Sequence, residues 1–113
     1  MPNTFKVKTK ASVPASLTTI YTVGSSTTAV VLGLSLCNKS ANAITASVQL
    51  VTDTSDTETN TTVMLLNTVP IPASTTLEFF GGQKLVIQTT DVVKVLASTT
   101  SALDATLSIM EIT

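Results

Sequence analysis

Apolar and polar residues alternate along most of the chain, which is the period-two pattern of β-strands with one buried face. The alternation is clearest in residues 44–51 and 103–109. In the first segment, the side chains expected to face inward are Ile44, Ala46, Val48 and Leu50. In the second, they are Leu103, Ala105, Leu107 and Ile109. The same pattern predicts further strands at residues 5–11, 17–23 and 63–66.

Residues 27–38 form the most apolar run, and β-branched residues within it favour a strand over a buried helix. One face carries large residues that we expect in the core, namely Val30, Leu32, Leu34 and Leu36. The opposite face carries smaller ones, namely Val31, Gly33, Ser35 and Cys37. A face of small residues suits the close approach of another layer or subunit.

Residues 68–97 contain three apolar runs separated by turn signals, and we expect a three-stranded meander there. Pro70 and Pro72 flank Ile71, which should therefore be extended. Gly81-Gly82 predicts a two-residue hairpin between residues 77–80 and 84–88. A second turn at residues 89–91 leads into the third run.

These segments give about eight or nine short strands, and no helix with caps is evident. The expected fold is all-β, an antiparallel β-sandwich or jelly roll. A length of 113 residues suits a single domain, residues 1–113, in which residues 1–13 form an edge strand or an arm. The core lacks Trp and is built from Val, Leu and Ile, so we expect additional burial in a homo-oligomer, a trimer or dimer.

Three of the six basic residues lie on one face of the first predicted strand: Lys6, Lys8 and Lys10. On an edge strand, such lysines block pairing with another sheet edge. Alternatively, they form an interface, in which the arm packs on the acidic remainder of the chain or on an acidic partner.

The composition disfavours several classes of function. The chain has no His and no Arg, which argues against general-base catalysis by His and against specific nucleic-acid binding. Cys37 is the single cysteine, so we expect no intrachain disulfide and no cysteine metal cluster. No ligand motif is evident, so neither a metal nor a cofactor is expected. No apolar run is long enough to cross a membrane, and the N-terminus does not resemble a signal peptide, which predicts synthesis in a cytosol.

Two further stretches carry predictions of their own, an exposed loop and a pair of aromatic residues. Residues 52–61 contain no apolar residue and should form an exposed loop. Its acidic and amide side chains are Asp53, Asp56, Glu58 and Asn60, which lack the spacing and glycine of a calcium loop.

Phe79 and Phe80 are neighbours on a predicted strand, so one should enter the core and the other should be an interface residue.

The stretch VPIPASTTLEFFGGQKLVIQTTDVVKVLAS, continued by SALDATLSIMEI, resembles a group of short virion proteins of tailed bacteriophages, marine cyanophages among them. It covers roughly the last half of the chain. Similar phage chains tend to have Gly where this one has Ser74 and Thr90. The turns at these two positions are therefore expected to differ in type from those of the phage chains. The resemblance implies a structural role in the virion and implies no catalytic residues.

The resulting hypothesis is a capsid decoration protein, one that stabilises the particle through contacts with another virion protein such as the major capsid protein. A tail, neck or fibre-base component is the alternative within the same class. A carbohydrate-binding β-sandwich is a more remote alternative, because sugar platforms usually need exposed aromatic faces and the chain has few aromatic residues. An enzyme is not expected.

Overall fold

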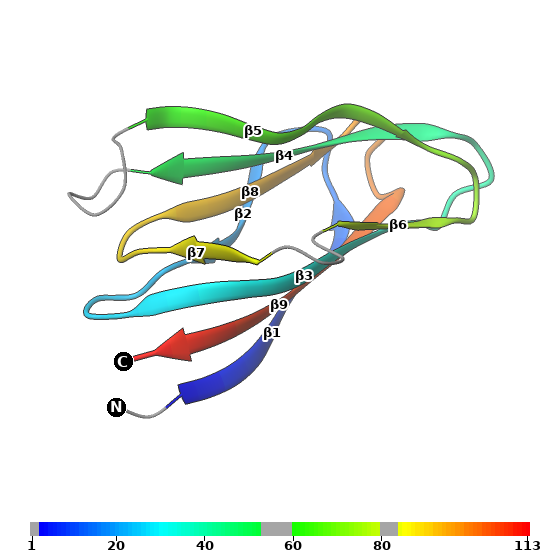
Figure 1. The fold of residues 1–113 in the computed structure, drawn as a ribbon. Coiled ribbons are helices and arrows are strands. Elements are labelled where there is room, and N and C mark those ends of the chain that lie inside the picture. Colours follow the sequence, from blue (N-terminus) through cyan, green and yellow to red (C-terminus); the bar gives the residue numbers. More distant parts are fainter. Residues whose placement is uncertain (1–2, 53–59, 80–83) are drawn as a thin grey trace.

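A computed structural model describes residues 3–52, 60–79 and 84–113 of the chain. Within these residues there are nine β-strands (Figure 1). Their bounds are β1 Asn3–Val13, β2 Thr18–Thr22, β3 Thr28–Asn38, β4 Ile44–Thr52, β5 Asn60–Ile71, β6 Thr76–Phe79, β7 Leu85–Ile87, β8 Val92–Ala97 and β9 Leu103–Ile112. None of the described segments is a helix that is long and apolar enough to cross a membrane.

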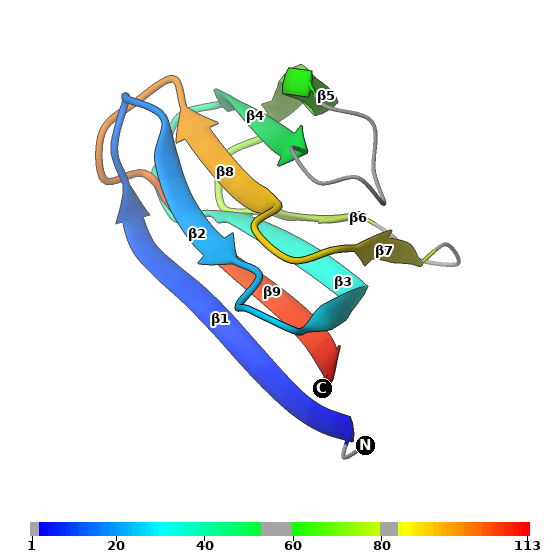
Figure 2. The ribbon, with the colours of Figure 1, turned by 90° about the vertical axis from the view of Figure 1, so that its left-hand side faces the viewer.

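The strands form two antiparallel sheets that lie as two layers (Figures 1 and 2). The first, called the β1 sheet below, has the order β1-β9-β3-β6, with β7 also paired to β3. The second, called the β2 sheet, has the order β2-β8-β4-β5. The expected all-β sandwich is therefore confirmed.

The strand order is that of a jelly roll. β6 and β7 both run antiparallel to β3, one against its second half and the other against its first, so together they act as one interrupted strand. With these two counted as one, the first strand pairs with the last, the second with the next to last, and so on inward to β4 and β5. A long hairpin wound in this way gives two four-stranded layers.

The predicted meander is wrong. β6 and β7 run in the same direction, because each is antiparallel to β3, so the chain does not reverse between them as a hairpin would. Gly81 and Gly82 themselves lie outside the described residues. The turn at residues 89–91 is present, but it carries the chain from β7 in one sheet to β8 in the other. Turn residues predicted the breaks correctly and the pairing incorrectly.

The core lies between the two sheets and follows the alternation in β4 and β9. All eight residues predicted to face inward in these strands are buried. Ile71 is also buried, and it pairs with Ile44 at the end of β5, as the flanking prolines predicted. Pro70 is tolerated because β5 is an edge strand, where a missing N–H leaves no ladder bond unmade.

The inward face of β3 changes along the strand. Leu34 and Leu36 are buried as expected, but in the first half the buried residue is Val31 rather than Val30. A register shift against β9 between Val31 and Gly33 adds one residue, Leu32, to β3. A β-bulge of this kind moves the inward set by one position, so the predicted single stripe was half right.

Asn38 ends β3 and is fully buried, at 0% exposure. Its side-chain amide N–H groups lie within bonding distance of three carbonyl oxygens, at 2.9 Å, 3.0 Å and 3.1 Å. These carbonyls belong to Asn42, Ile71 and Pro72. Its amide oxygen accepts from the backbone N–H and hydroxyl of Ser40, at 3.0 Å and 2.8 Å. This neutral network ties the β3–β4 loop to the end of β5.

Candidate functional site

The outward face of the β1 sheet carries a row of apolar side chains across four strands. Phe5 of β1 pairs with Met110 of β9, Met110 pairs with Val30 of β3, and Val30 pairs with Val86 of β7. Directly opposed residues of an antiparallel ladder lie on the same face. We call these four residues the apolar row. Phe5 is 71% exposed and Val86 is 53% exposed.

The surface next to the apolar row is uncharged and open. Val7, which is 59% exposed, lies opposite Ser108, and Ser108 lies opposite Gly33. A Cβ atom built on Gly33 would have no heavy atom within 4 Å. Of the predicted small-residue face, Gly33, Ser35 and Cys37 thus lie on an outer surface, whereas Val31 is buried. No described part of the chain closes over this surface at Gly33.

The lysines of β1 lie on the other face of the strand, opposite the buried residues Ile109, Leu107 and Ala105 of β9. β1 and β2 are neighbouring edges of the two sheets (Figure 2). Lys6 Nζ lies 2.8 Å from Glu111 Oε1. The Tyr21 hydroxyl donates to Glu111 Oε2 at 2.6 Å. Lys8 Nζ lies 5.9 Å from the centre of the Tyr21 ring, within the range of a cation–π contact. Two of the three predicted interface lysines therefore contact the chain's own residues.

Burial and hydrogen bonding shift the acid–base properties of this cluster. Tyr21 is 5% exposed, and burial, followed by the hydrogen bond to Glu111, raises the pKa of its hydroxyl well above the ordinary 10.0. The hydrogen bond from Lys6, followed by the one from Tyr21, lowers the pKa of the Glu111 carboxyl below 4.5. The Lys6 side chain is 43% exposed, so this ion pair contributes only about 0–1 kcal/mol to folding.

A second polar group lies where β1 shifts register against β9, between Lys10 and Val13. Ser12 adopts a φ of 54° there, and its backbone N–H donates to Asp104 Oδ1 at 2.8 Å. Lys39 Nζ lies 3.0 Å from the same oxygen and also donates to the Ser12 hydroxyl. The bond from Ser12, followed by that from Lys39, lowers the pKa of the Asp104 carboxyl.

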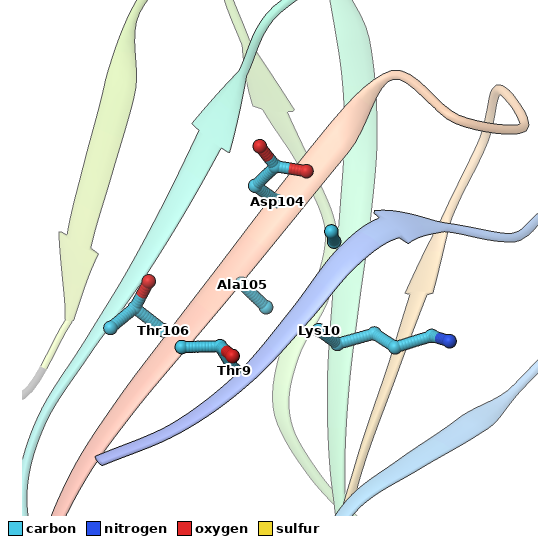
Figure 3. Close-up of a pocket in the computed structure, with 6 residues that line it drawn as sticks. Thr9, Lys10, Asp104, Ala105 and Thr106 are labelled. Carbon is cyan, nitrogen blue, oxygen red and sulfur yellow. The ribbon is translucent and has the colours of Figure 1, made fainter.

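A shallow hollow of about 230 Å³ lies beside this bulge (Figure 3). Thr9 and Thr106 are neighbours across the β1–β9 pair, whereas Lys10 extends away from them. The hollow is lined by Thr9, Lys10, Ala11, Asp104, Ala105 and Thr106. Its one carboxylate, that of Asp104, already accepts bonds from Ser12 and Lys39.

The sequence-predicted residues are thus only partly brought together. Lys6 and Lys8 join one cluster and Lys10 lines the hollow. Phe80 lies outside the described residues, and for Phe79 the structure gives the backbone alone, paired to Leu34. Their predicted division between core and interface therefore stays a prediction. Sequence reasoning missed the apolar row, because the pairing that aligns its four members was not foreseen.

Among the described residues, no group of three or more His, Cys, Asp or Glu side chains is placed to hold a metal ion. Asp53, Asp56 and Glu58 lie outside the described residues. The exposed loop predicted for residues 52–61 is shorter than expected, because Thr52 is buried at the end of β4 and Asn60 begins β5. Cys37 is half-buried on the outer face of β3, opposite Asp104 and Thr76.

Comparisons with protein-family models, with curated proteins and with solved structures found no match.

Proposed function

We propose that the protein is a structural protein of a bacteriophage particle, and that it works through contacts with other protein surfaces. The observation that carries the proposal is the outer face of the β1 sheet, where three apolar side chains are each more than half exposed: Phe5, Val7 and Val86. A contiguous, uncharged apolar patch of this kind is typical of a protein interaction site. Decoration of the capsid is the form of this role that we favour.

The assignment to a phage particle rests on the resemblance of the C-terminal half. Ser74 and Thr90, the two positions where similar phage chains tend to have Gly, adopt φ angles of 56° and 69°. Positive φ is the conformation that glycine enters at least cost. The backbone at both positions is therefore one that a chain with Gly could share, which supports the resemblance. The turns at Ser74 and Thr90 thus need not differ in type from those of the similar phage chains.

A sugar-binding role gains nothing from the aromatic side chains that the structure describes. The Tyr21 ring is buried, and its hydroxyl is used by Glu111. Phe5 is exposed, but Met110 lies opposite it and Val7 lies two residues along the same face, so it is a single ring beside aliphatic side chains and not an aromatic platform. The jelly-roll fold does not decide the matter, because it hosts many functions.

The test is to locate the chain on purified particles. Antibodies against the protein, detected by gold labelling in electron microscopy, should mark the capsid surface of gradient-purified particles from an infected culture. Labelling confined to the tail, neck or fibre base would replace decoration by the alternative structural role. A chain that is abundant in the lysate and absent from purified particles would overturn the proposal.

A further inference from the structure

Two regions of the outer surface could pair with another protein, namely the apolar row and the free edge of β1. β1 spans 11 residues and pairs with β9 along one edge, and no other described strand pairs with it along the other. An unpaired strand edge of this length is a template for adding a strand. The two regions adjoin each other, because Phe5 and Val7 belong to β1.

Edge pairing between two copies is disfavoured by the lysines. A two-fold axis that pairs β1 with a second β1 keeps each face of the strand on the same side. Lys6, Lys8 and Lys10 of one copy would therefore meet the same lysines of the other. Like charges directly opposite each other in an antiparallel pair are destabilising. The lysine face thus protects the edge of β1 from pairing with a second copy. The outer apolar face is the candidate contact surface that remains.

We propose that two copies of the chain pack face to face through the apolar row. In a contact between identical surfaces, residue i of one copy meets residue j of the other and j meets i, so a face of like charges repels itself and an uncharged one does not. The apolar row and its neighbours Val7, Ser108 and Gly33 carry no charge. Gly33 adds a point at which the second sheet can approach closely.

The available area is sufficient for a weak, specific dimer. Four strands about 4.8 Å apart and roughly 30 Å long present a face of about 600 Å². Two such faces would bury about 1,200 Å² together, which is the lower end of the range for specific interfaces. The acidic residues of this face, Asp104 and Glu78, lie toward its other end, opposite Cys37 and Ser35 of β3. We therefore expect a micromolar dimer rather than an obligate one.

The test measures the mass of the purified chain by sedimentation velocity between about 5 µM and 500 µM. The mass should rise from 11.7 kDa to twice that value. Phe5→Glu combined with Val86→Glu should hold the chain at 11.7 kDa throughout. These two side chains are largely exposed, so thermal unfolding should show that the variant is folded.

The matched control is Leu17→Glu combined with Val63→Glu. Both residues are exposed and apolar, at 42% and 36%, and neither belongs to the β1 sheet. This variant has the same change of charge and should still dimerise. If the first variant fails to fold, Gly33→Glu replaces it, because the space around Gly33 is open. Loss of the dimer in that variant supports the proposal, and an unchanged dimer overturns it.

Three results would overturn the proposal: a wild-type chain that stays monomeric, a mass other than two chains, or equal masses for the two double variants. The inference rests on the proposed structural role, but the two can fail separately. A monomer that is nevertheless found on particles would remove the dimer alone. A dimer that is absent from particles would remove the phage role alone.

Discussion

Two polar clusters of this sandwich, the Asn38 network and the cluster around Glu111, differ in the way they are held. Asn38 is neutral, fully buried, and bonded to loop atoms on both sides of its amide. Glu111 is charged, with a side chain that is 14% exposed, and its lysine partner is 43% exposed. One cluster closes the end of the sandwich and the other lies at its open side.

The difference lies in what is lost when each cluster is disrupted. Breaking the Asn38 network removes the buried hydrogen bond to the carbonyl oxygen of Ile71, and a buried polar group left unpaired costs about 1–3 kcal/mol. Breaking the Lys6–Glu111 pair returns both charges to water, so little is lost. Burial therefore sets the size of the loss in each cluster.

The largest effect should come from Asn38→Asp. The substitution keeps the size of the side chain but turns its donor into a carboxylate oxygen that faces the carbonyls of Ile71 and Pro72. We expect a loss of about 3–5 kcal/mol in the free energy of unfolding, because a buried charge is left without a partner. Urea unfolding monitored by circular dichroism would measure the loss.

Asn42→Asp is the matched control for this substitution. It makes the same chemical change, but Asn42 is exposed and enters the network through its backbone oxygen. Its free energy of unfolding should stay within about 0.5 kcal/mol of the wild-type value. Similar losses in both variants would show that the network is not the cause.

Tyr21→Phe should have the next largest effect. It removes the hydroxyl that donates to Glu111 at 2.6 Å and leaves the ring in place. A hydrogen bond to a charged group contributes about 1.5–3 kcal/mol, and we expect the lower end because Glu111 retains its bond to Lys6. Equilibrium unfolding near neutral pH would measure it, and a change below about 0.5 kcal/mol would contradict the assigned role of this bond.

The two clusters should also differ in their response to pH, because the side chain of Asn38 does not titrate. The pKa of Glu111 is lowered on folding, so its contribution is complete above 4.5 and is lost as the pH falls through the folded pKa. The pKa of Tyr21 is raised, so its contribution is complete below 10.0 and is lost as the pH rises above that value. Stability should therefore be flat in between and fall on both sides.

Variants can assign each side of this profile. Tyr21→Phe should reduce the fall above pH 10.0, where Tyr21 titrates. Asp104 also has a lowered pKa, so Asp104→Asn is needed to separate its share of the fall in acid from that of Glu111. An alkaline limb that is identical in Tyr21→Phe and wild type would show that Tyr21 does not cause it.

The sequence predicted the positions of the strands better than it predicted their bulges and their pairing. Alternation identified the buried faces of β4 and β9, because both strands lie inside their sheets and face the core along their length. It failed in β3 because a one-residue bulge at Leu32 leaves no mark in the pattern of side chains. It could not show that β6 and β7 share one direction, because that depends on pairing with a strand about 50 residues away.

The candidate site was the hardest part to predict. The alternation in β1 separates Phe5 and Val7 from the lysines, but it does not say which face turns inward. The lysines turn inward because Glu111 and Tyr21 offer them partners, and these come from the far end of the chain and from the other sheet. The apolar row depends likewise on the register of three strand pairs, which the sequence does not state.

The smallest effect on folding should come from replacing the lysines of β1. Lys6→Gln, Lys8→Gln and Lys10→Gln together should change the free energy of unfolding by about 1 kcal/mol or less, because the Lys6–Glu111 pair is partly exposed and the Lys8–Tyr21 contact is weak. Raising the salt concentration should shrink the difference further by screening the charges.

The triple variant also separates two roles for these lysines. If they serve as contacts to an acidic partner, occupancy on the particle should fall, and more so at raised salt, since many weak contacts act together. If they serve to keep the edge of β1 unpaired, occupancy should be unchanged, whereas the purified variant should form larger, β-rich assemblies, because the repulsion that prevents edge pairing is gone. Quantifying the chain on gradient-purified particles, beside light scattering of the free protein, distinguishes the two. A variant that keeps both its occupancy and its solution mass would assign the lysines to neither role and leave Lys6 with the ion pair to Glu111 alone.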